Sequence, residues 1–547
     1  MHLVVKLAIC AGLGLCSASG FAQQAGNPFE GVSPPDEQII GDPDRDDLVP
    51  PVVAPDQSVQ QSRDREAFTI GAVSVKSGIE IAAGDLARAY EPFIGEEASE
   101  DKLRDLANTI SEIAREKGYI FASAHIPAQS VKIGVVEVLL DPGAIDEVRI
   151  IGSENRRLRK ILDRLKNRPT LATRVERQLL FVADLPGITL LNSNYRRENG
   201  KGILVVSVRE DKAKGHLALD NFGPETLGPF RARLDLDIAG LLTDGDILTT
   251  NVISSIVQPK ELTYVNARYA VTLGDGATVV GISAAAGRTH SGGNLADFEF
   301  TGQNRYASGF VSHAVKRGRD VNLWINGEVA FLDARQSQNG TIFQNEQIAT
   351  AAVNISGNYN IGVGRIYGGV GITQGLGILG ANRLGDPLNS RNDGSGIFTK
   401  GNFWINSIFD LGDGFGLRLA GNAQIASRPL LSSNELAVGG PYFGKGYDFS
   451  ERFGDEGAMG LAEVRKEFKK VNEWLDWFQL YAFVDGGHAS NKGTGFGDGS
   501  LASAGGGIRA QIGKLDLGIE AAAPLTRDRF ESGDRSPKIS FQIGLRF

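Results

Sequence analysis

From about Gly215 to the last residue, the sequence alternates between apolar and polar residues with a period of two, and we find no convincing helical pattern there. The clearest case is the stretch 231–238. Its apolar positions are Ala232, Leu234, Leu236 and Ile238, and its charged positions are Arg231, Arg233, Asp235 and Asp237. Such alternation between Gly, Asn and Asp turns predicts β-strands. It fits either a soluble sandwich, whose apolar face forms a core, or a barrel, whose apolar face meets lipid.

Three features favour the membrane barrel. The last strand-like segment alternates and ends on an aromatic residue, Phe547, as is typical of outer-membrane barrels. Four tryptophans lie in this part of the chain, where interfacial girdles would use them: Trp324, Trp404, Trp474 and Trp477. About 335 residues of strand and turn are too many for one sandwich, and about 21 residues per strand and turn give roughly sixteen strands. The expected fold class is therefore a transmembrane antiparallel β-barrel of about 16 strands over residues 212–547.

The first residues have the layout of an export signal. Residues 1–22 carry a positive start, an apolar run and small residues before Gln23, which predicts a signal peptide. Both cysteines, Cys10 and Cys16, fall inside it, so no disulfide framework is expected after cleavage. The alternative is a lipid anchor on Cys16, but the preceding Leu13-Gly14-Leu15 has a bulky residue where that cleavage favours a small one. Residues 23–66 are rich in Pro and Asp, which predicts a linker.

Residues 67–211 have a different pattern, with two small mixed α/β units that each run strand, helix, helix, strand, strand. In the first unit, Ser99 is expected to cap a helix that Gly118 closes. In the second unit, a helix is expected over 156–165, and another is expected to open with a capping box formed by Thr173 and Glu176.

Enzymatic and nucleic-acid functions find little support. The formal net charge of −8 argues against a nucleic-acid partner. The six histidines have no metal-ligand spacing, and we expect no catalytic group, metal or cofactor. Residues 375–380 fit GxGxxG, but they are not preceded by a buried parallel strand or followed by a helix, so no nucleotide site is expected. Glu463 and Arg465 alternate with apolar residues and are interpreted as lumen charges, like those of 231–238.

One loop and one strand contain the candidate functional residues. The glycine-rich stretch 439–457 carries a cation, Lys445, between Gly444 and Gly446. In the strand-like run 478–487, alternation directs the odd-numbered residues into the lumen. These residues are Gln479, Tyr481, Phe483, Asp485 and Gly487.

From about Phe68 to Phe547 the chain resembles the outer-membrane transporters of two-partner secretion, the filamentous-haemagglutinin and haemolysin secretors of the Omp85 superfamily. The segments that carry the resemblance are Gly118-Tyr119, Ile126-Pro127-Ala128-Gln129, Gly134, the run 179–187, Asp220-Asn221-Phe222-Gly223, Lys445-Gly446-Tyr447 and Phe483-Val484-Asp485-Gly486-Gly487. The resemblance implies a first POTRA domain over 67–142, a second over 143–211 and the barrel over 212–547.

In this family the tip of the long sixth extracellular loop faces the Phe-x-Asp-x-Gly strand inside the barrel. The resemblance therefore implies a loop latch made of Lys445, Gly446, Tyr447, Phe483, Asp485 and Gly487, with Lys445 paired to Asp485. The alternative is that Lys445 is a solvated loop charge and Asp485 an ordinary lumen residue. Relatives usually have arginine at the tip, and lysine offers a point charge without the bidentate fork. Relatives often begin with a plug helix, for which the proline-rich segment leaves little room.

The implied function is a pore in the outer membrane of a Gram-negative bacterium, with its POTRA domains in the periplasm. Its expected partners are outer-membrane lipid and one large, β-helical exoprotein, which the POTRA domains recognise unfolded and the pore exports. No nucleic acid, nucleotide or cofactor is expected to take part. The alternatives are an insertase for other outer-membrane proteins, which usually carries more POTRA units, and a passive porin.

Overall fold

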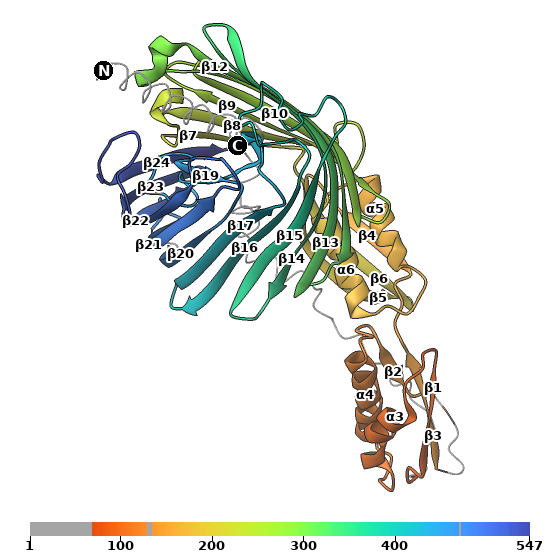
Figure 1. Cartoon of the computed structure of the whole chain (residues 1–547). Helices are drawn as coiled ribbons and strands as arrows, with labels where there is room; N and C mark the ends of the chain where they lie inside the picture. Colours follow the sequence, from red (N-terminus) through yellow and green to blue (C-terminus); the bar gives the residue numbers. More distant parts are fainter. Residues whose placement is uncertain (1–67, 128, 130–133, 470–471) are drawn as a thin grey trace, which may run out of the picture.

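The computed structural model describes residues 68–547 except 128, 130–133 and 470–471 (Figure 1). The expected signal peptide, the linker and Ala128 lie outside the described residues. The described chain forms two small mixed α/β units followed by a closed barrel, as the sequence predicts. Within the described part, no helix is both long and apolar enough to cross a membrane.

The first unit packs two helices on a three-stranded sheet. Its elements are β1 (Ala72–Ser77), α3 (Ala83–Tyr90), the 3-10 turn η2 (Glu91–Phe93), α4 (Glu100–Glu116), β2 (Ser123–His125) and β3 (Val135–Asp141). The sheet order is β1-β3-β2, so β1 and β2 are its edges. As expected, Ser99 caps α4, because its Oγ accepts a hydrogen bond of 3.2 Å from the N–H of Lys102. Leu106 and Ile110 of α4 pack on Val136 and Val138 in the core.

The second unit repeats this arrangement next to the barrel. Its elements are β4 (Glu147–Ile151), α5 (Arg156–Leu162), η3 (Asp163–Leu165), α6 (Ala172–Ala183), β5 (Ile188–Glu198) and β6 (Lys201–Glu210), with sheet order β4-β6-β5. The predicted capping box is wrong. The N-cap of α6 is Leu171, without a side-chain cap, and Thr173 lies inside the helix. The helix begins earlier because the N–H of Ala172 donates to the carbonyl of Gly118 in the first unit, at 2.8 Å.

Sixteen antiparallel strands close into the barrel, which confirms the predicted number. They are β7 (Ala213–Asp220), β8 (Arg231–Ala239), β9 (Asp246–Ser255), β10 (Leu262–Leu273), β11 (Thr278–His290), β12 (Phe300–Lys316), β13 (Val321–Gln338), β14 (Thr341–Asn360), β15 (Gly364–Leu376), β16 (Thr399–Gly412), β17 (Phe415–Ala426), β20 (Glu456–Lys469), β21 (Trp477–Ser490), β22 (Gly499–Ile512), β23 (Leu515–Pro524) and β24 (Lys538–Arg546).

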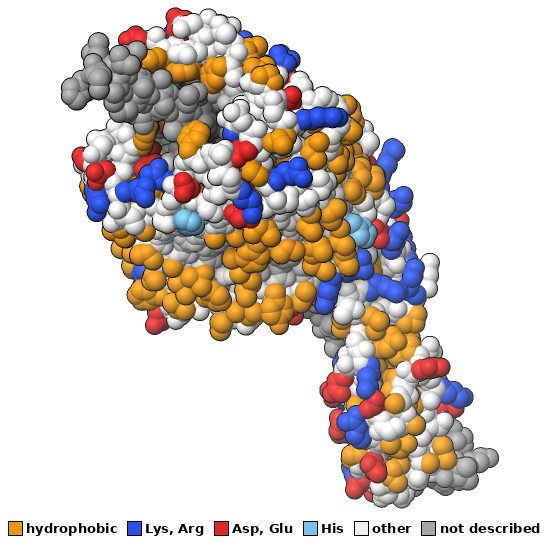
Figure 2. All heavy atoms as spheres, in the orientation of Figure 1, with side chains coloured by type: hydrophobic (Ala, Val, Ile, Leu, Met, Phe, Trp, Pro, Cys, Tyr) orange, Lys and Arg blue, Asp and Glu red, His pale blue; other side chains and the backbone are white. Residues whose placement is uncertain are grey.

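The residues that alternate in the sequence point alternately to the lumen and to the outer surface of the barrel. In β21, Leu480 and Val484 are exposed on the outer wall, whereas Tyr481, Phe483 and Asp485 are buried on the inner one. Apolar side chains form a broad belt across the outer wall of the barrel on the face that Figure 2 shows. Such a belt suits a bilayer, in which every backbone group must be paired within the wall.

The first and last strands meet at the shortest pairing of the wall. Five residue pairs join β24 to β7, from Gln542↔Asp220 to Arg546↔His216. Beyond them the side chain of Asn221 continues the pairing: its Nδ2 donates to the carbonyl of Ile539 at 2.9 Å, and its Oδ1 accepts from the N–H of Phe541 at 2.8 Å. Asn221 therefore acts as a side-chain substitute for a further backbone pair.

Short turns join most strands at the rim next to the second unit, and longer loops join most strands at the far rim, where β13 and β14 are an exception with a two-residue turn. Four of these far loops are used below: L5 (377–398), L6 (427–455), L7 (491–498) and L8 (525–537). L6 contains the 3-10 turn η6 (Ser432–Asn434) and a small hairpin made of β18 (Leu436–Val438) and β19 (Arg452–Gly454).

Candidate functional site

The tip of L6 folds back against the inner wall of the barrel. Val438 and Tyr447 of L6 are fully buried and pack on Ala489 of β21 and Leu501 of β22. A tight turn shapes the tip: the N–H of Tyr447 donates to the carbonyl of Gly444 at 2.9 Å, and Gly444 has φ +77°. This positive φ is in the region that glycine enters without strain. The glycine flanking Lys445 is thus required by the turn.

Asp485 of β21 holds this turn through its backbone. Its Oδ2 accepts hydrogen bonds from the N–H groups of Gly444, at 2.8 Å, and Lys445, at 3.0 Å. Its Oδ1 accepts from the Oγ of Ser503 on β22, which in turn accepts from the N–H of Gly446 at 3.1 Å. A buried carboxylate satisfied by several donors is a strong anchor.

Gly446 lies too close to the wall for any larger residue. A Cβ on this glycine would lie 2.8 Å from the Cβ of Ser503 and 2.9 Å from the backbone nitrogen of Pro524. The backbone atoms of β23 cannot move without disturbing the sheet. Only glycine permits this approach.

The ammonium group of Lys445 differs from expectation. Its Nζ lies 2.6 Å from Oε2 of Glu520 on β23, and it pairs with this carboxylate instead of with Asp485. The physical reason is that Asp485 already accepts two backbone N–H groups and the Ser503 hydroxyl, whereas the carboxylate of Glu520 faces the same lumen and accepts side-chain donors. The hydroxyl of Tyr481 also donates to Glu520, at 2.9 Å, and the Nζ stands 4.4 Å from the ring centroid of Phe483. The residues expected to form a latch thus gather at one place, but the ion pair has another partner.

The two residues after Gly446 connect L6 to L8. The hydroxyl of Tyr447 lies 2.8 Å from Oγ1 of Thr526 and accepts from the N–H of the same residue at 3.0 Å. Asp448 pairs with Arg529 of L8 at 2.7 Å and with Lys538 at the start of β24 at 3.3 Å. Gly487, the last of the expected latch residues, faces the β18–β19 hairpin of L6, because a Cβ on it would lie 3.0 Å from Cγ1 of Val438.

The structure places the expected lumen charges in two groups. In the first strands, Arg231 pairs with Asp220 at 2.9 Å and Arg233 with Asp235 at 2.9 Å, while Asp237 accepts from Thr249 at 2.7 Å. In the later strands, Glu463 of β20 is fully buried and accepts two hydrogen bonds from Arg509 of β22, at 2.9 and 3.0 Å. Arg465 lies near this pair on the same strand.

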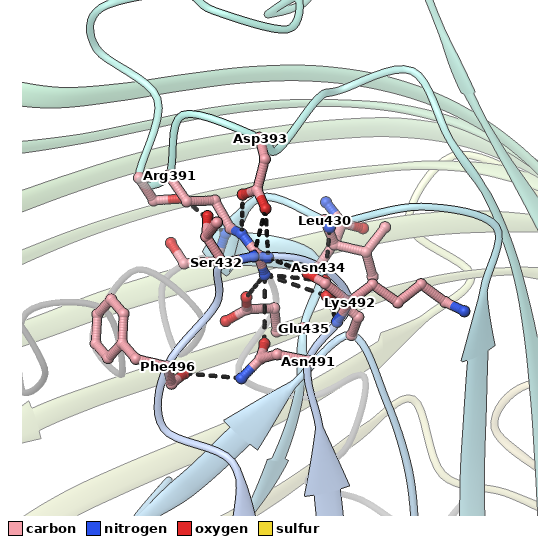
Figure 3. Close-up of polar contacts among 12 residues, drawn as sticks. Arg391, Asp393, Leu430, Ser432, Asn434, Glu435, Asn491, Lys492 and Phe496 are labelled. Carbon is pink, nitrogen blue, oxygen red and sulfur yellow. Dashed lines mark hydrogen bonds and ion pairs between the residues drawn. The ribbon is translucent and has the colours of Figure 1, made fainter.

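A second cluster, not anticipated from the sequence, joins three far loops. Its centre is Arg391 of L5 (Figure 3). The guanidinium binds Asp393 of the same loop through Nε, at 2.7 Å, and lies 3.1 Å from Glu435 and 3.1 Å from Asp455, both in L6. Its Nη2 donates to the carbonyl of Lys492 in L7 at 2.5 Å. We call Arg391, Asp393, Glu435 and Asp455 the loop clasp.

The carboxylates of the clasp are mostly satisfied by backbone donors. Asp455 is fully buried and accepts from the N–H of Leu430, at 2.6 Å, and of Lys492, at 2.7 Å. Asp393 accepts from the N–H of Thr494 at 2.8 Å, and hydrogen bonding to Arg391 lowers its pKa from the ordinary value. Burial, with the neighbouring Asp455, raises the pKa of Glu435 to about 8. Glu435 is therefore mainly protonated at neutral pH, which leaves one cation facing two carboxylates.

Comparisons with known proteins cover both parts of the chain. Residues 200–510 match the family model described as haemolysin secretion/activation protein ShlB/FhaC/HecB, and residues 68–143 match that of the ShlB-type POTRA domain. The heme/hemopexin transporter protein HuxB of Haemophilus influenzae (strain 86-028NP) is 25% identical over 406 residues, which are 71% of this chain and 70% of that protein.

Two solved structures have the same fold. CdiB from Escherichia coli superposes with a TM-score of 0.73 at 16% identity, over 97% of this chain and 98% of that one. BamA from Haemophilus ducreyi, lacking POTRA domains 1-3, has a TM-score of 0.52 at 12% identity, over 88% of this chain and 100% of that one.

The family model covers more than half of the chain, and the resemblance stated from the sequence motifs is confirmed. The activity is transport and not catalysis. The barrel lies in the outer membrane, so the rim next to the POTRA domains is periplasmic and the far loops are extracellular. This chain belongs to the ShlB/FhaC/HecB family of two-partner secretion transporters, which export partner exoproteins across the outer membrane of Gram-negative bacteria.

Proposed function

We propose that this chain exports one large, β-helical exoprotein in an unfolded state, and that the tip of L6 must be held against the inner wall for export to proceed. The observation that carries the proposal is the double anchoring of Lys445, whose N–H binds Asp485 and whose Nζ pairs with Glu520. A loop of 29 residues would otherwise lose much conformational entropy on entering the lumen. The buried contacts offset this cost and fix where the exported chain can pass.

The two anchors make different contributions. The Lys445–Glu520 pair is almost fully buried, so removing one partner leaves an uncompensated charge, at a cost of about 3–5 kcal/mol. The Asp485 anchor depends on backbone N–H groups and does not require a particular side chain at position 445. Loss of the ion pair should therefore loosen the tip, whereas loss of Asp485 should release the turn.

Export by variants tests this role. Lys445→Met and Glu520→Gln should each reduce the secreted exoprotein, and the double variant should export no worse than the worse single one, because the pair is already lost. The control is Lys492→Met in L7, whose pair with Glu456 is 3.0 Å long and more exposed to solvent than the Lys445–Glu520 pair. Exposed pairs contribute little. Wild-type secretion by both single variants would reject the role of the tip.

The periplasmic end offers an edge for the unfolded partner. In the second POTRA unit β5 is an edge strand, and its register shifts between Leu190 and Asn192, which leaves Leu191 54% exposed. An extended polypeptide can add to such an edge through main-chain hydrogen bonds. A photo-crosslinker at Leu191 or Asn194 of β5 in the full-length protein would test this recognition, with a crosslinker at Glu112, on the exposed face of α4, as the control. Crosslinks to the exported chain at Glu112 alone would refute recognition through β5.

One genetic experiment separates the exporter from the alternatives. Deletion of the gene should abolish surface or medium accumulation of a large exoprotein and leave the assembly of other barrels and the uptake of small solutes unchanged. A general loss of outer-membrane proteins would indicate an insertase. Unchanged exoproteins with altered solute uptake would indicate a porin.

A further inference from the structure

Helix α5 of the second POTRA unit and the 3-10 turn η3 present a cationic face. Leu158, Ile161 and Leu162 are fully buried in the core, and the opposite face consists of exposed charged residues. Those residues are Arg156, Arg159, Lys160, Asp163 and Arg164. They recur every three or four positions and line a shallow cleft of about 410 Å³. Four cations and one carboxylate therefore share a single surface.

Most of this charge has no protein counterpart. Arg164 pairs with Asp275 at 2.9 Å, and Asp163 pairs with Lys166 at 2.5 Å. Within the described residues, the side chains of Arg156, Arg159 and Lys160 make no ion pair. Like charges at helical spacing of three or four residues repel one another and destabilise a helix. An anion bound from outside would reverse this effect.

The cationic face is fixed to the periplasmic rim of the barrel. The N–H of Arg156 donates to Oδ2 of Asp244, in the turn between β8 and β9, at 3.0 Å. The Arg164–Asp275 pair reaches the turn between β10 and β11, where Gly276 packs against Phe181 and Ile161. Two neighbouring turns of the wall thus hold the helix at both ends.

Two exposed leucines lie in the turn that holds the start of α5. Leu241 and Leu242, in the turn between β8 and β9, are 50% and 74% exposed. The turn is firmly built, because the carboxylate of Asp246 accepts the N–H groups of Leu241, Leu242 and Thr243 at 2.7–2.8 Å. These leucines follow directly on the lipid-facing residues of β8. Their exposure in water would be unfavourable, whereas the boundary between acyl chains and headgroups would bury them.

The cations lie next to the apolar belt on its periplasmic side, which is where the headgroups of a bilayer would be. Figure 2 shows Lys and Arg side chains gathered on the side of the second POTRA unit that adjoins the apolar belt of the barrel. Cations placed just beyond the apolar boundary meet the phosphate layer of the leaflet, where each adds to the electrostatic attraction to anionic lipid. Arginine also binds phosphate bidentately.

We propose that the cationic face of α5, together with Leu241 and Leu242, is a binding site for the phosphate headgroup of an anionic phospholipid in the periplasmic leaflet. The leucines enter the acyl boundary, and Arg156, Arg159 and Lys160 bind the phosphate. This contact fixes the second POTRA unit against the membrane and so sets its direction relative to the barrel entrance.

The test uses the full-length protein in nanodiscs of phosphatidylcholine, to which phosphatidylglycerol or phosphate-free diacylglycerol is added. Native mass spectrometry after release counts the lipids retained. The wild type should retain phosphatidylglycerol and not diacylglycerol. The triple variant Arg156→Gln/Arg159→Gln/Lys160→Gln should lose the retained phosphatidylglycerol, and Leu241→Ser/Leu242→Ser should weaken its retention.

The matched control removes three exposed cations from the first POTRA unit, away from the barrel, in Arg88→Gln/Arg104→Gln/Lys117→Gln. Heat-modifiable migration in gels verifies that every variant has a folded barrel. Competition by inorganic phosphate would support a phosphate site but assign it to free phosphate instead of lipid, which overturns the lipid assignment. Equal lipid retention by the triple variant and the control overturns the proposal. If the triple variant keeps its lipid but loses the crosslinks from β5 to the exported chain, the surface belongs to that chain instead.

Discussion

Arg391→Met should open the extracellular loops. Methionine keeps an unbranched stem that reaches about as far as the arginine Nε, but it removes the cation that faces Asp393 and Asp455. Removing one partner of a buried ion pair costs about 3–5 kcal/mol. We expect the lower end, about 3 kcal/mol, because the backbone N–H groups of Leu430, Lys492 and Thr494 still satisfy part of the carboxylates.

Hydrogen exchange measures this loss at the site itself. The amides of Leu430 and Lys492 donate to Asp455, so their exchange reports on opening of the clasp. About 3 kcal/mol corresponds to exchange roughly a hundredfold faster, since each tenfold change is about 1.4 kcal/mol. Arg383→Met is the matched control, because Arg383 is an exposed cation of the same loop. Equal protection in both variants would refute the assigned role of Arg391.

Three further predictions concern the clasp, the tip and the first POTRA unit. The pKa of Glu435 is raised from 4.5 to about 8. The stability that protonated Glu435 gives to the closed loops is therefore complete below about pH 4.5 and is lost as the pH rises towards 8. Glu435→Gln should make the hydrogen exchange of L6 amides less dependent on pH over this range, and an unchanged pH profile would contradict the assignment. Gly446→Ala should reduce export and raise protease sensitivity of L6, whereas Gly518→Ala, with open space around its Cβ, should have no effect; equal export by the two would show that the tip tolerates a methyl group. Ser99→Ala should lower the free energy of unfolding of the first POTRA unit by about 1 kcal/mol, because α4 loses its N-cap. Hydrogen exchange of the α4 amides measures this loss, and Ser77→Ala is a control outside any helix.

The barrel strands and the two small α/β units could be predicted because each depends on a periodic signal, and the strand number followed from the length of the strand-rich part of the chain. Alternation in β21 places Asp485 inside and Val484 outside whatever the rest of the chain does. The start of α6 could not be predicted, because a backbone contact from Gly118 of the other unit, and not a local cap, decides it. Local patterns thus fix faces and lengths, and long-range contacts decide where an element begins.

The partner of Lys445 and the loop clasp were missed for the same reason. Glu520 alternates with Ile519 and Ala521, so its inward direction was readable, but its distance from the tip of L6 depends on how the loop folds into the lumen. Arg391 lies in L5, and Glu435 and Asp455 lie near the two ends of the L6 hairpin, in stretches without periodicity, so that only the loop arrangement brings the three together. A signal did exist in L5, where an arginine is followed two residues later by an aspartate, but such pairs are common on surfaces.

The arrangement of the tip explains how a lysine can stand where relatives of this family usually have arginine. If the tip cation had to bind Asp485 itself, the loss of a bidentate fork would weaken the anchor. Here Asp485 is bound by two backbone N–H groups and by Ser503, none of which depends on the side chain at position 445. The side chain needs only to bring one positive charge to Glu520, and an ammonium group 2.6 Å away does so. The anchor and the ion pair are therefore separable, and we expect Lys445→Arg to keep export while Asp485→Asn, which weakens the acceptor of both N–H groups, reduces it.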